Sequence, residues 1–280
     1  ARLKPRTDMT QLAPGPDLAA LPVFGDAKTW SDEIVHSARR LLAGEITSRD
    51  VEATLLYGPP GTGKTVLAAA VARSAGMNFV RTSAADWFVS SDGNLGGVLK
   101  AADSFFNTLA ASAPAVGFID ELDALPDRAA TSADKREWWQ AVVTGVLLMI
   151  GRSLASQRKI ILIAATNHPD HIDAAVKRPG RFGRHVYVRP AQSEAEIVAV
   201  LSYHLGSELD SAAIAEIAAV AGLPTAAEVE GWVRAARATA SNAGRPMLVS
   251  DILDQIAPAD TRSAQDLRLA AGRGLAPFPF

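Results

Sequence analysis

The first two thirds of the chain alternate between two patterns of hydrophobic and polar residues. Short, mainly apolar runs lie at residues 53–57, 115–119 and 159–165, and further short strand candidates lie at residues 77–81 and 185–188. Such runs are typical of strands that are buried on both faces of a parallel sheet. Between them, apolar residues recur at helical spacing over residues 30–42, 66–73, 96–113 and 139–150. This order of strands and helices predicts an α/β fold, an open parallel sheet with right-handed crossovers and helices on both faces.

The pattern changes after Pro190, where only helical spacing remains. The predicted helices of this second part lie at residues 194–204, 211–221, 225–240 and 250–256. We therefore expect an α/β domain over residues 23–190 and a small all-helical domain over residues 191–257. Residues 1–22 contain a proline-rich run and are predicted to be a linker, and residues 258–280 are predicted to be a linker or tail.

The composition argues against several kinds of site. Lys and Arg number 28 against 30 Asp and Glu, with no basic block, so the electrostatic footprint of a nucleic-acid groove is missing. Cysteine is absent, and the five histidines form no His-Glu-x-x-His motif, which argues against disulfides and a zinc site. Because no apolar run approaches the roughly 18 residues of a spanning helix, we expect no membrane segment.

Residues 58–65 read Gly-Pro-Pro-Gly-Thr-Gly-Lys-Thr, between a predicted strand and a predicted helix. Glycines let successive backbone N–H groups point inward, and the helix adds the positive end of its dipole, so this loop is predicted to bind phosphates. Lys64 is expected to reach the β- and γ-phosphates of ATP, and the Thr65 hydroxyl to contact Mg²⁺. The predicted nucleotide-binding residues here are Pro60, Gly61, Thr62, Gly63, Lys64, Thr65 and Val66.

Polar side chains follow two of the predicted buried strands, where the ligand crevice of a parallel sheet lies. Asp120 is a hard oxygen acceptor, so we expect it near Mg²⁺ opposite Thr65. Glu121 is expected to act as the general base or to orient water. Asn167 follows the next strand, and its amide can donate to the γ-phosphate and hold the attacking water.

Four stretches together resemble the AAA family of ATPases, at residues 58–65, 118–125, 164–170 and 178–184. In that family they correspond, in this order, to Walker A, Walker B, sensor 1 and the arginine-finger loop. The match runs from about residue 23 to residue 256. Their order and spacing look most like the ATPase module of FtsH-type AAA metalloproteases, although no zinc-protease motif follows in this chain.

The resemblance implies a ring-shaped homo-oligomer, usually a hexamer. Arg178 and Arg181 would then act on the nucleotide of the neighbouring subunit, where an arginine neutralises charge that develops on the γ-phosphoryl group. The resemblance also implies that the adenine lies near Gly25 and near Ala226 and Ala227.

The chain departs from the family pattern at several positions. Ser91 stands where many protein-threading members have an aromatic pore residue, and Gly183 stands where aspartate is common. Leu201 falls where a ribose-contacting histidine is frequent, and residues 222–228 follow the usual helical-domain pattern only loosely. These departures bear on the threading of a protein partner and on nucleotide affinity. They do not bear on hydrolysis, because the expected hydrolytic residues are all present.

The sequence thus predicts a cytoplasmic ring motor that hydrolyses Mg-ATP and remodels or unfolds a protein partner. One alternative is a nucleotide-dependent assembly scaffold with little turnover. Another is a nucleic-acid remodeller, which the near-neutral charge disfavours.

Overall fold

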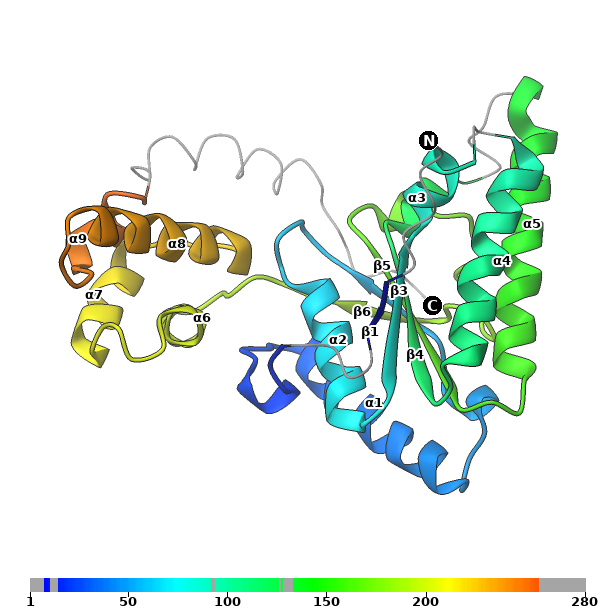
Figure 1. Cartoon of the computed structure of the whole chain (residues 1–280), viewed down its shortest axis with the longest axis horizontal. Coiled ribbons are helices and arrows are strands. Elements are labelled where there is room, and N and C mark those ends of the chain that lie inside the picture. The colour runs from blue at the N-terminus through cyan, green and yellow to red at the C-terminus, as the bar shows by residue number, and fades with distance from the viewer. Residues whose placement is uncertain (1–7, 11–14, 92–93, 126, 128–132, 257–280) are drawn as a thin grey trace. The chain divides into compact units, whose positions relative to one another are not determined.

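The computed structural model describes residues 8–10, 15–91, 94–125, 127 and 133–256 (Figure 1). The chain divides into two compact units, Ala1–Arg189 and Pro190–Phe280. The boundary predicted after residue 190 lies one residue beyond this division. The predicted tail, residues 258–280, lies outside the described residues.

The first unit is built on a six-stranded sheet with the strand order β1-β3-β4-β5-β2-β6. The strands are β1 Asp8–Thr10, β2 Thr54–Tyr57, β3 Asn78–Ser83, β4 Ala115–Asp120, β5 Ile160–Thr166 and β6 Arg184–Tyr187. All neighbouring pairs among β2 to β6 are parallel. The predicted α/β fold with a parallel sheet is therefore confirmed.

The amino-terminal segment is more ordered than the linker that the sequence predicts. Strand β1 pairs antiparallel with β3, with Asp8 opposite Arg81. A short 3₁₀ turn, Leu18–Ala20, buries Leu18, whose backbone N–H donates to the Ser74 hydroxyl at 2.9 Å. The linker prediction is wrong for these segments, because a three-residue edge strand pairs through its backbone and needs no side-chain periodicity.

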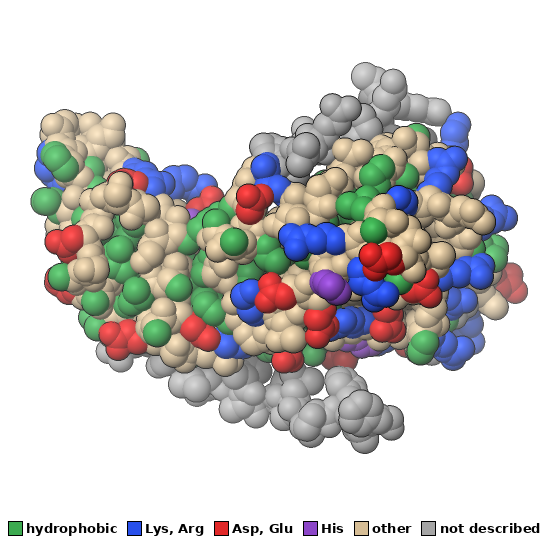
Figure 2. All heavy atoms as spheres, turned by 90° about the horizontal axis from the view of Figure 1, so that it is seen from below, with side chains coloured by type: hydrophobic (Ala, Val, Ile, Leu, Met, Phe, Trp, Pro, Cys, Tyr) green, Lys and Arg blue, Asp and Glu red, His purple; other side chains and the backbone are tan. Residues whose placement is uncertain are grey.

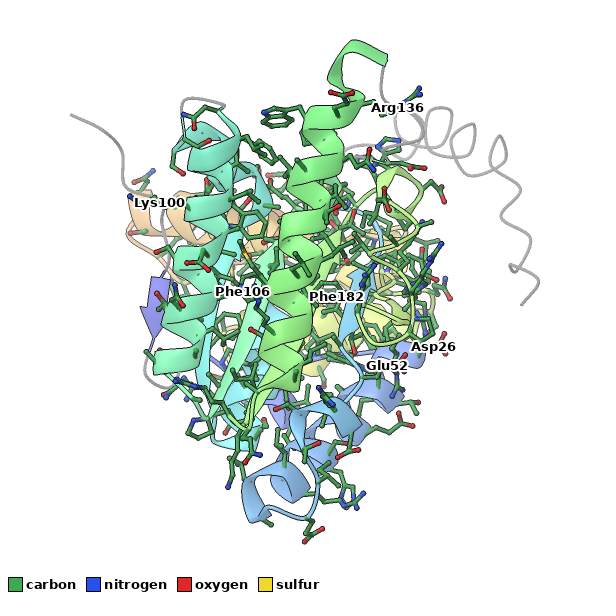
Figure 3. The ribbon with its side chains drawn as sticks, turned by 90° about the vertical axis from the view of Figure 1, so that its right-hand side faces the viewer. Asp26, Glu52, Lys100, Phe106, Arg136 and Phe182 are labelled. Carbon is green, nitrogen blue, oxygen red and sulfur yellow. The ribbon has the colours of Figure 1, made fainter. Side chains whose placement is uncertain are left out.

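Helices cover both faces of the parallel strands and bury nearly all of the central strands β2, β4 and β5. They are α1 Asp26–Ala43, α2 Lys64–Ala75, α3 Ala84–Val89, α4 Leu95–Ala111 and α5 Ala133–Ala155. In β5, Ile161 and Ile163 pack with α1 and α2, whereas Ile160 and Leu162 pack with α4 and α5. Figure 3 shows α4 and α5 side by side over that second face. This double burial explains the continuously apolar strand runs.

Within α5, the stretch Arg136–Ala155 is long and apolar enough to cross a membrane, judged by length and composition alone. This finding differs from the expectation that no such run exists. In the structure, Val142, Val146 and Ile150 are fully buried against α4 and the sheet. The helix is therefore a core element of the first unit. Near its start, Trp139 packs on Phe88 with ring centroids 5.3 Å apart, so the aromatic pair at 138–139 serves packing.

The described part of the second unit is all helical, as predicted. Its helices are α6 Glu194–Leu205, α7 Ser211–Val220, α8 Ala226–Asn242 and α9 Val249–Leu253. Leu201, Ile217 and Ile252 are fully buried in it. Helix α8 begins with a capping box, in which Thr225 and Glu228 satisfy each other's backbone N–H groups.

The close approach of α4 to the sheet generates a stability prediction. A Cβ at Gly117 in β4 would lie 2.5 Å from a methyl group of Leu109 and 3.0 Å from one of Leu162, both fully buried. Gly117→Ala is therefore expected to lower the free energy of unfolding by about 1–3 kcal/mol. Urea denaturation followed by tryptophan fluorescence measures this change.

Gly151 in α5 is the matched control for Gly117, because a Cβ there meets nothing within 4 Å. Gly151→Ala is expected to raise the free energy of unfolding by about 0.5–1 kcal/mol, since alanine restricts the unfolded chain and favours helix. Equal effects of the two substitutions would contradict the packing argument.

Candidate nucleotide-binding site

The glycine-rich loop joins the end of β2 to the start of α2. Gly58, Gly61 and Gly63 have φ angles of 150°, 79° and 84°, values that side chains rarely tolerate. A Cβ at Gly58 would also lie 2.3 Å from the carbonyl oxygen of Val188, which follows β6. The glycines therefore let the loop curl tightly against the neighbouring strand at the carboxyl edge of the sheet. This places the loop at the amino terminus of α2, as the sequence predicts for a phosphate site.

Lys64 is held inside its own loop. Its Nζ donates to the carbonyl oxygens of Gly58 at 2.9 Å and Pro59 at 2.8 Å. Burial lowers the pKa of Lys64 to about 8, although the negative charges of Asp120 and Asp123 oppose the shift. A phosphate group that enters the loop can replace these neutral carbonyls with charged oxygens, which favours the protonated lysine.

The Asp120 carboxylate, at the end of β4, joins the loop to the centre of the sheet. Its Oδ2 accepts a hydrogen bond from the Thr65 hydroxyl at 3.0 Å, and its Oδ1 accepts one from the backbone N–H of Glu121 at 3.1 Å. The structure thus brings together Thr65 and Asp120, the two predicted Mg²⁺ residues. Hydroxyl and carboxylate oxygens are the hard donors that Mg²⁺ prefers, so the residues fit this ion.

The described residues contain no group of three His, Cys, Asp or Glu side chains placed to bind a metal. Mg²⁺ usually takes one or two protein ligands and completes its shell with water and substrate phosphates. A hydroxyl and a carboxylate beside a phosphate loop match that habit.

Glu121 has an unusual backbone. Its φ of 51° makes it the one non-glycine residue with a positive φ in the described part of the chain. The side chain is exposed at the edge of the sheet, where the Ser83 hydroxyl donates to its Oε2 at 2.6 Å. A left-handed conformation is costly for glutamate, so the surrounding structure has to hold Glu121 in it, and such strained positions cluster at active sites.

Two residues of this cluster are missing from the sequence prediction. Ser83 bonds Glu121, and Arg81 forms an ion pair with Asp120 at 3.0 Å between Nη2 and Oδ2. The predicted strand stopped at residue 81, whereas β3 continues to Ser83, which lies opposite Asp120 in register. A polar residue at the end of this strand was the available signal.

Asn167 follows β5 and is exposed. The residues around it are fixed: the Thr166 hydroxyl donates to Asp123 Oδ1 at 2.6 Å and accepts the backbone N–H of His168 at 2.9 Å. Because β5 lies between β2 and β4, Asn167 lies at the carboxyl ends of the strands, between the phosphate loop and the carboxylates of Asp120 and Glu121.

The arginine loop is anchored by the fully buried ring of Phe182, labelled in Figure 3. Arg181 donates from Nη1 to the carbonyl oxygen of Ala175 at 2.6 Å, whereas Arg178 is exposed. A Cβ at Gly183 would lie 2.9 Å from Pro179 Cα and 2.5 Å from Glu52 Oε1. This crowding explains why glycine replaces the aspartate that is common at this position.

The residues predicted to lie near the adenine occupy helix starts. Gly25 caps α1 with a φ of 57°, and a Cβ there would lie 3.1 Å from Arg189 Nε. Beside it, the Arg189 guanidinium lies 5.6 Å from the centroid of the Phe24 ring. Ala226 and Ala227 form the first turn of α8. The adenine contacts of Gly25, Ala226 and Ala227 stay predictions.

Ser91, at the position of the usual pore aromatic, is buried and donates to the Phe88 carbonyl oxygen at 3.0 Å. The two residues that follow it, Asp92 and Gly93, lie outside the described part of the chain. Charges of both signs are interspersed over the face of the first unit seen in Figure 2, rather than gathered into one basic field.

Comparison with known proteins identifies the family of this site. Residues 54–190 match the family model described as "ATPase family associated with various cellular activities (AAA)". The chain is 38% identical over 144 residues to ATPase family gene 2 protein of Saccharomyces cerevisiae, 51% of this chain and 18% of that protein. It is 36% identical over 191 residues to ATP-dependent zinc metalloprotease FtsH 1 of Symbiobacterium thermophilum, 68% of this chain and 32% of that protein.

A third relative is the cell division cycle protein 48 homolog of Archaeoglobus fulgidus, 36% identical over 188 residues, 65% of this chain and 24% of that protein. The chain thus matches 18% to 32% of the length of these relatives. The similar identities do not separate an FtsH-type from a Cdc48-type assignment, so the finer FtsH resemblance stays a prediction. Residues 54–190 form an ATPase domain of the AAA family, the class of domain that binds and hydrolyses ATP.

Proposed function

We propose that this chain is the motor part of an AAA protein that hydrolyses Mg-ATP in a ring and remodels a protein partner. The observation that carries the proposal is the hydrogen bond from Thr65 to Asp120. This bond joins the phosphate loop to the end of β4, where Asp120 and Glu121 lie. The carboxyl ends of the strands therefore carry side chains that can contact phosphate, a metal ion and water.

In this proposal the loop of residues 58–65 binds the triphosphate. Backbone N–H groups and the amino end of α2 contact the phosphate oxygens, and Lys64 exchanges its two carbonyl partners for the β- and γ-phosphates. Thr65 and Asp120 would hold Mg²⁺, which when bound neutralises charge on the β- and γ-phosphate oxygens. Gly25, Val66, Ala226 and Ala227 are proposed to contact the nucleoside.

Hydrolysis needs a water molecule placed and deprotonated next to the γ-phosphate. We assign this role to Glu121, whose carboxylate the Ser83 hydroxyl holds at the sheet edge. Asn167 is proposed to orient the same water and to donate to the γ-phosphate from the neighbouring strand end. Both side chains are exposed in the single chain, as groups that must reach a substrate have to be.

Ring assembly is proposed to complete the site. Arg178 is exposed on a loop that Phe182 anchors, and this exposure supports a role outside its own subunit. An arginine supplied by a neighbour makes hydrolysis depend on assembly, and Arg178 and Arg181 are the proposed residues. Hexamer formation, the α/β domain of residues 23–190 and the moving helical lid of residues 191–257 belong to this proposal, with residues 258–280 as a tail.

The partner is proposed to be a protein, because the relatives include proteins named ATP-dependent zinc metalloprotease. A net charge of −2 gives no support to a nucleic-acid partner. The cytoplasm is the proposed location. Ser91 supplies no aromatic side chain, so we propose that partner contact does not depend on an aromatic at this position.

Replacement of Glu121 tests the hydrolytic assignment. Glu121→Gln removes the base but keeps the shape, so phosphate release is expected to fall by about 10²- to 10⁴-fold while ATP binding persists. A steady-state phosphate assay and equilibrium binding of a fluorescent ATP analogue measure the two effects. Glu45→Gln, at an exposed residue paired with Arg40, is the control and should behave like the parent. Near-zero turnover in both parent and Glu121→Gln would instead indicate an assembly scaffold.

Subunit mixing tests whether the arginines act between subunits. Arg178→Ala is expected to lower turnover by about 10³- to 10⁵-fold, the effect of losing an arginine supplied by a neighbouring subunit. Glu121→Gln is also expected to lower turnover strongly. When the two variants are mixed, intact Arg178 from one subunit can complete intact Glu121 in another, so turnover should rise above that of either alone. Arg39→Ala, at an exposed residue of α1, serves as the control. Mixed samples as inactive as their components would show that Arg178 acts within its own subunit.

A further inference from the structure

Strand β3 supplies one side chain to each carboxylate of the site. Arg81 and Ser83 are two residues apart and therefore emerge on the same face of the sheet. Arg81 Nη2 lies 3.0 Å from Asp120 Oδ2, and Ser83 Oγ lies 2.6 Å from Glu121 Oε2. The serine contact suits a group that orients a base. The arginine contact needs a different explanation, because it adds a positive charge where a metal ion is expected.

Arg81 binds the same oxygen of Asp120 that accepts the Thr65 hydroxyl. Since Thr65 is a proposed Mg²⁺ ligand, Oδ2 is the oxygen that would face the ion. The Arg81 guanidinium and Mg²⁺ both carry positive charge, so they would repel each other across this oxygen.

The two partners of the ion pair differ in their freedom to move. The Arg81 side chain is 48% exposed, whereas that of Asp120 is 19% exposed and is fixed by hydrogen bonds on both oxygens. Arg81 can therefore swing into solvent while Asp120 stays in place. In the part of the chain that the structure describes, no other ion pair involves Asp120.

We propose that Arg81 is a positioning residue that occupies the metal-facing oxygen of Asp120 in the nucleotide-free protein and competes with Mg²⁺ for it. This inference rests on the proposed function of the site. Before Mg²⁺ can use Asp120, Arg81 has to release Oδ2, and this cost weakens metal binding. The phosphates of a nucleotide add the negative charge that tips the competition, so the metal enters with the nucleotide rather than before it.

The test is equilibrium binding of a fluorescent ATP analogue to the purified chain as free Mg²⁺ is varied. In Arg81→Ala and Arg81→Gln, the Mg²⁺ concentration at half-maximal binding is expected to fall by about two- to fivefold, the range that half-exposed ion pairs reach. Arg81→Lys keeps the charge and should stay near the parent. Arg40→Ala is the matched control, because Arg40 in α1 is 47% exposed and pairs with Glu45, which follows that helix.

Several outcomes would overturn the inference. An unchanged Mg²⁺ midpoint in both neutral variants removes the competition, and a midpoint that falls equally in Arg81→Lys assigns the effect to something other than charge. Weaker binding of the analogue by Arg81→Ala in excess EDTA would mean that Arg81 contacts the nucleotide itself. Failure of the parent to bind the analogue at any Mg²⁺ concentration would contradict the proposed function instead. Circular dichroism of each variant checks the fold, and the three replacements give three separate comparisons.

Discussion

The site depends on one carboxylate that accepts hydrogen bonds from three segments. Asp120 receives the Thr65 hydroxyl from α2, the Arg81 guanidinium from β3 and the backbone N–H of Glu121. These bonds fix the phosphate loop against the centre of the sheet. Asp120 accepts hydrogen bonds from both the Thr65 hydroxyl and the backbone N–H of Glu121. The backbone of Glu121 is therefore held in a fixed position relative to the loop. Asp120 therefore both holds the loop against the sheet and lies among the residues proposed to act on the nucleotide.

Burial on both faces of the sheet made much of the fold predictable. The runs that became β4 and β5 are apolar up to their last residues, and short runs of this kind are typical of central strands. The glycines of the phosphate loop were equally informative, because positive φ angles leave few other residues possible. Strand β1 could not be predicted, since its pairing uses the backbone of β3 alone.

The site residues predicted from the sequence follow the ends of predicted strands. Ser83 was missed because the predicted strand ended at residue 81, two residues before the end of β3. Ser83 and Arg81 reach the carboxylates only because β3 runs in register with β4 to its last residue, and register is a long-range property. Packing explains two departures from the family pattern that the sequence alone left open. Gly183 lacks space for a side chain, and Leu201 is a core residue of the helical unit.

The contacts of Lys64 inside its own loop set a condition on any anion that binds there. Its ammonium group already has two carbonyl partners inside the loop, and burial makes a bare positive charge there costly. An anion that enters this loop has to replace both carbonyl contacts of Lys64 to reach the ammonium group. Anions that bring several charged oxygens to the lysine at once are therefore favoured over those that bring only one.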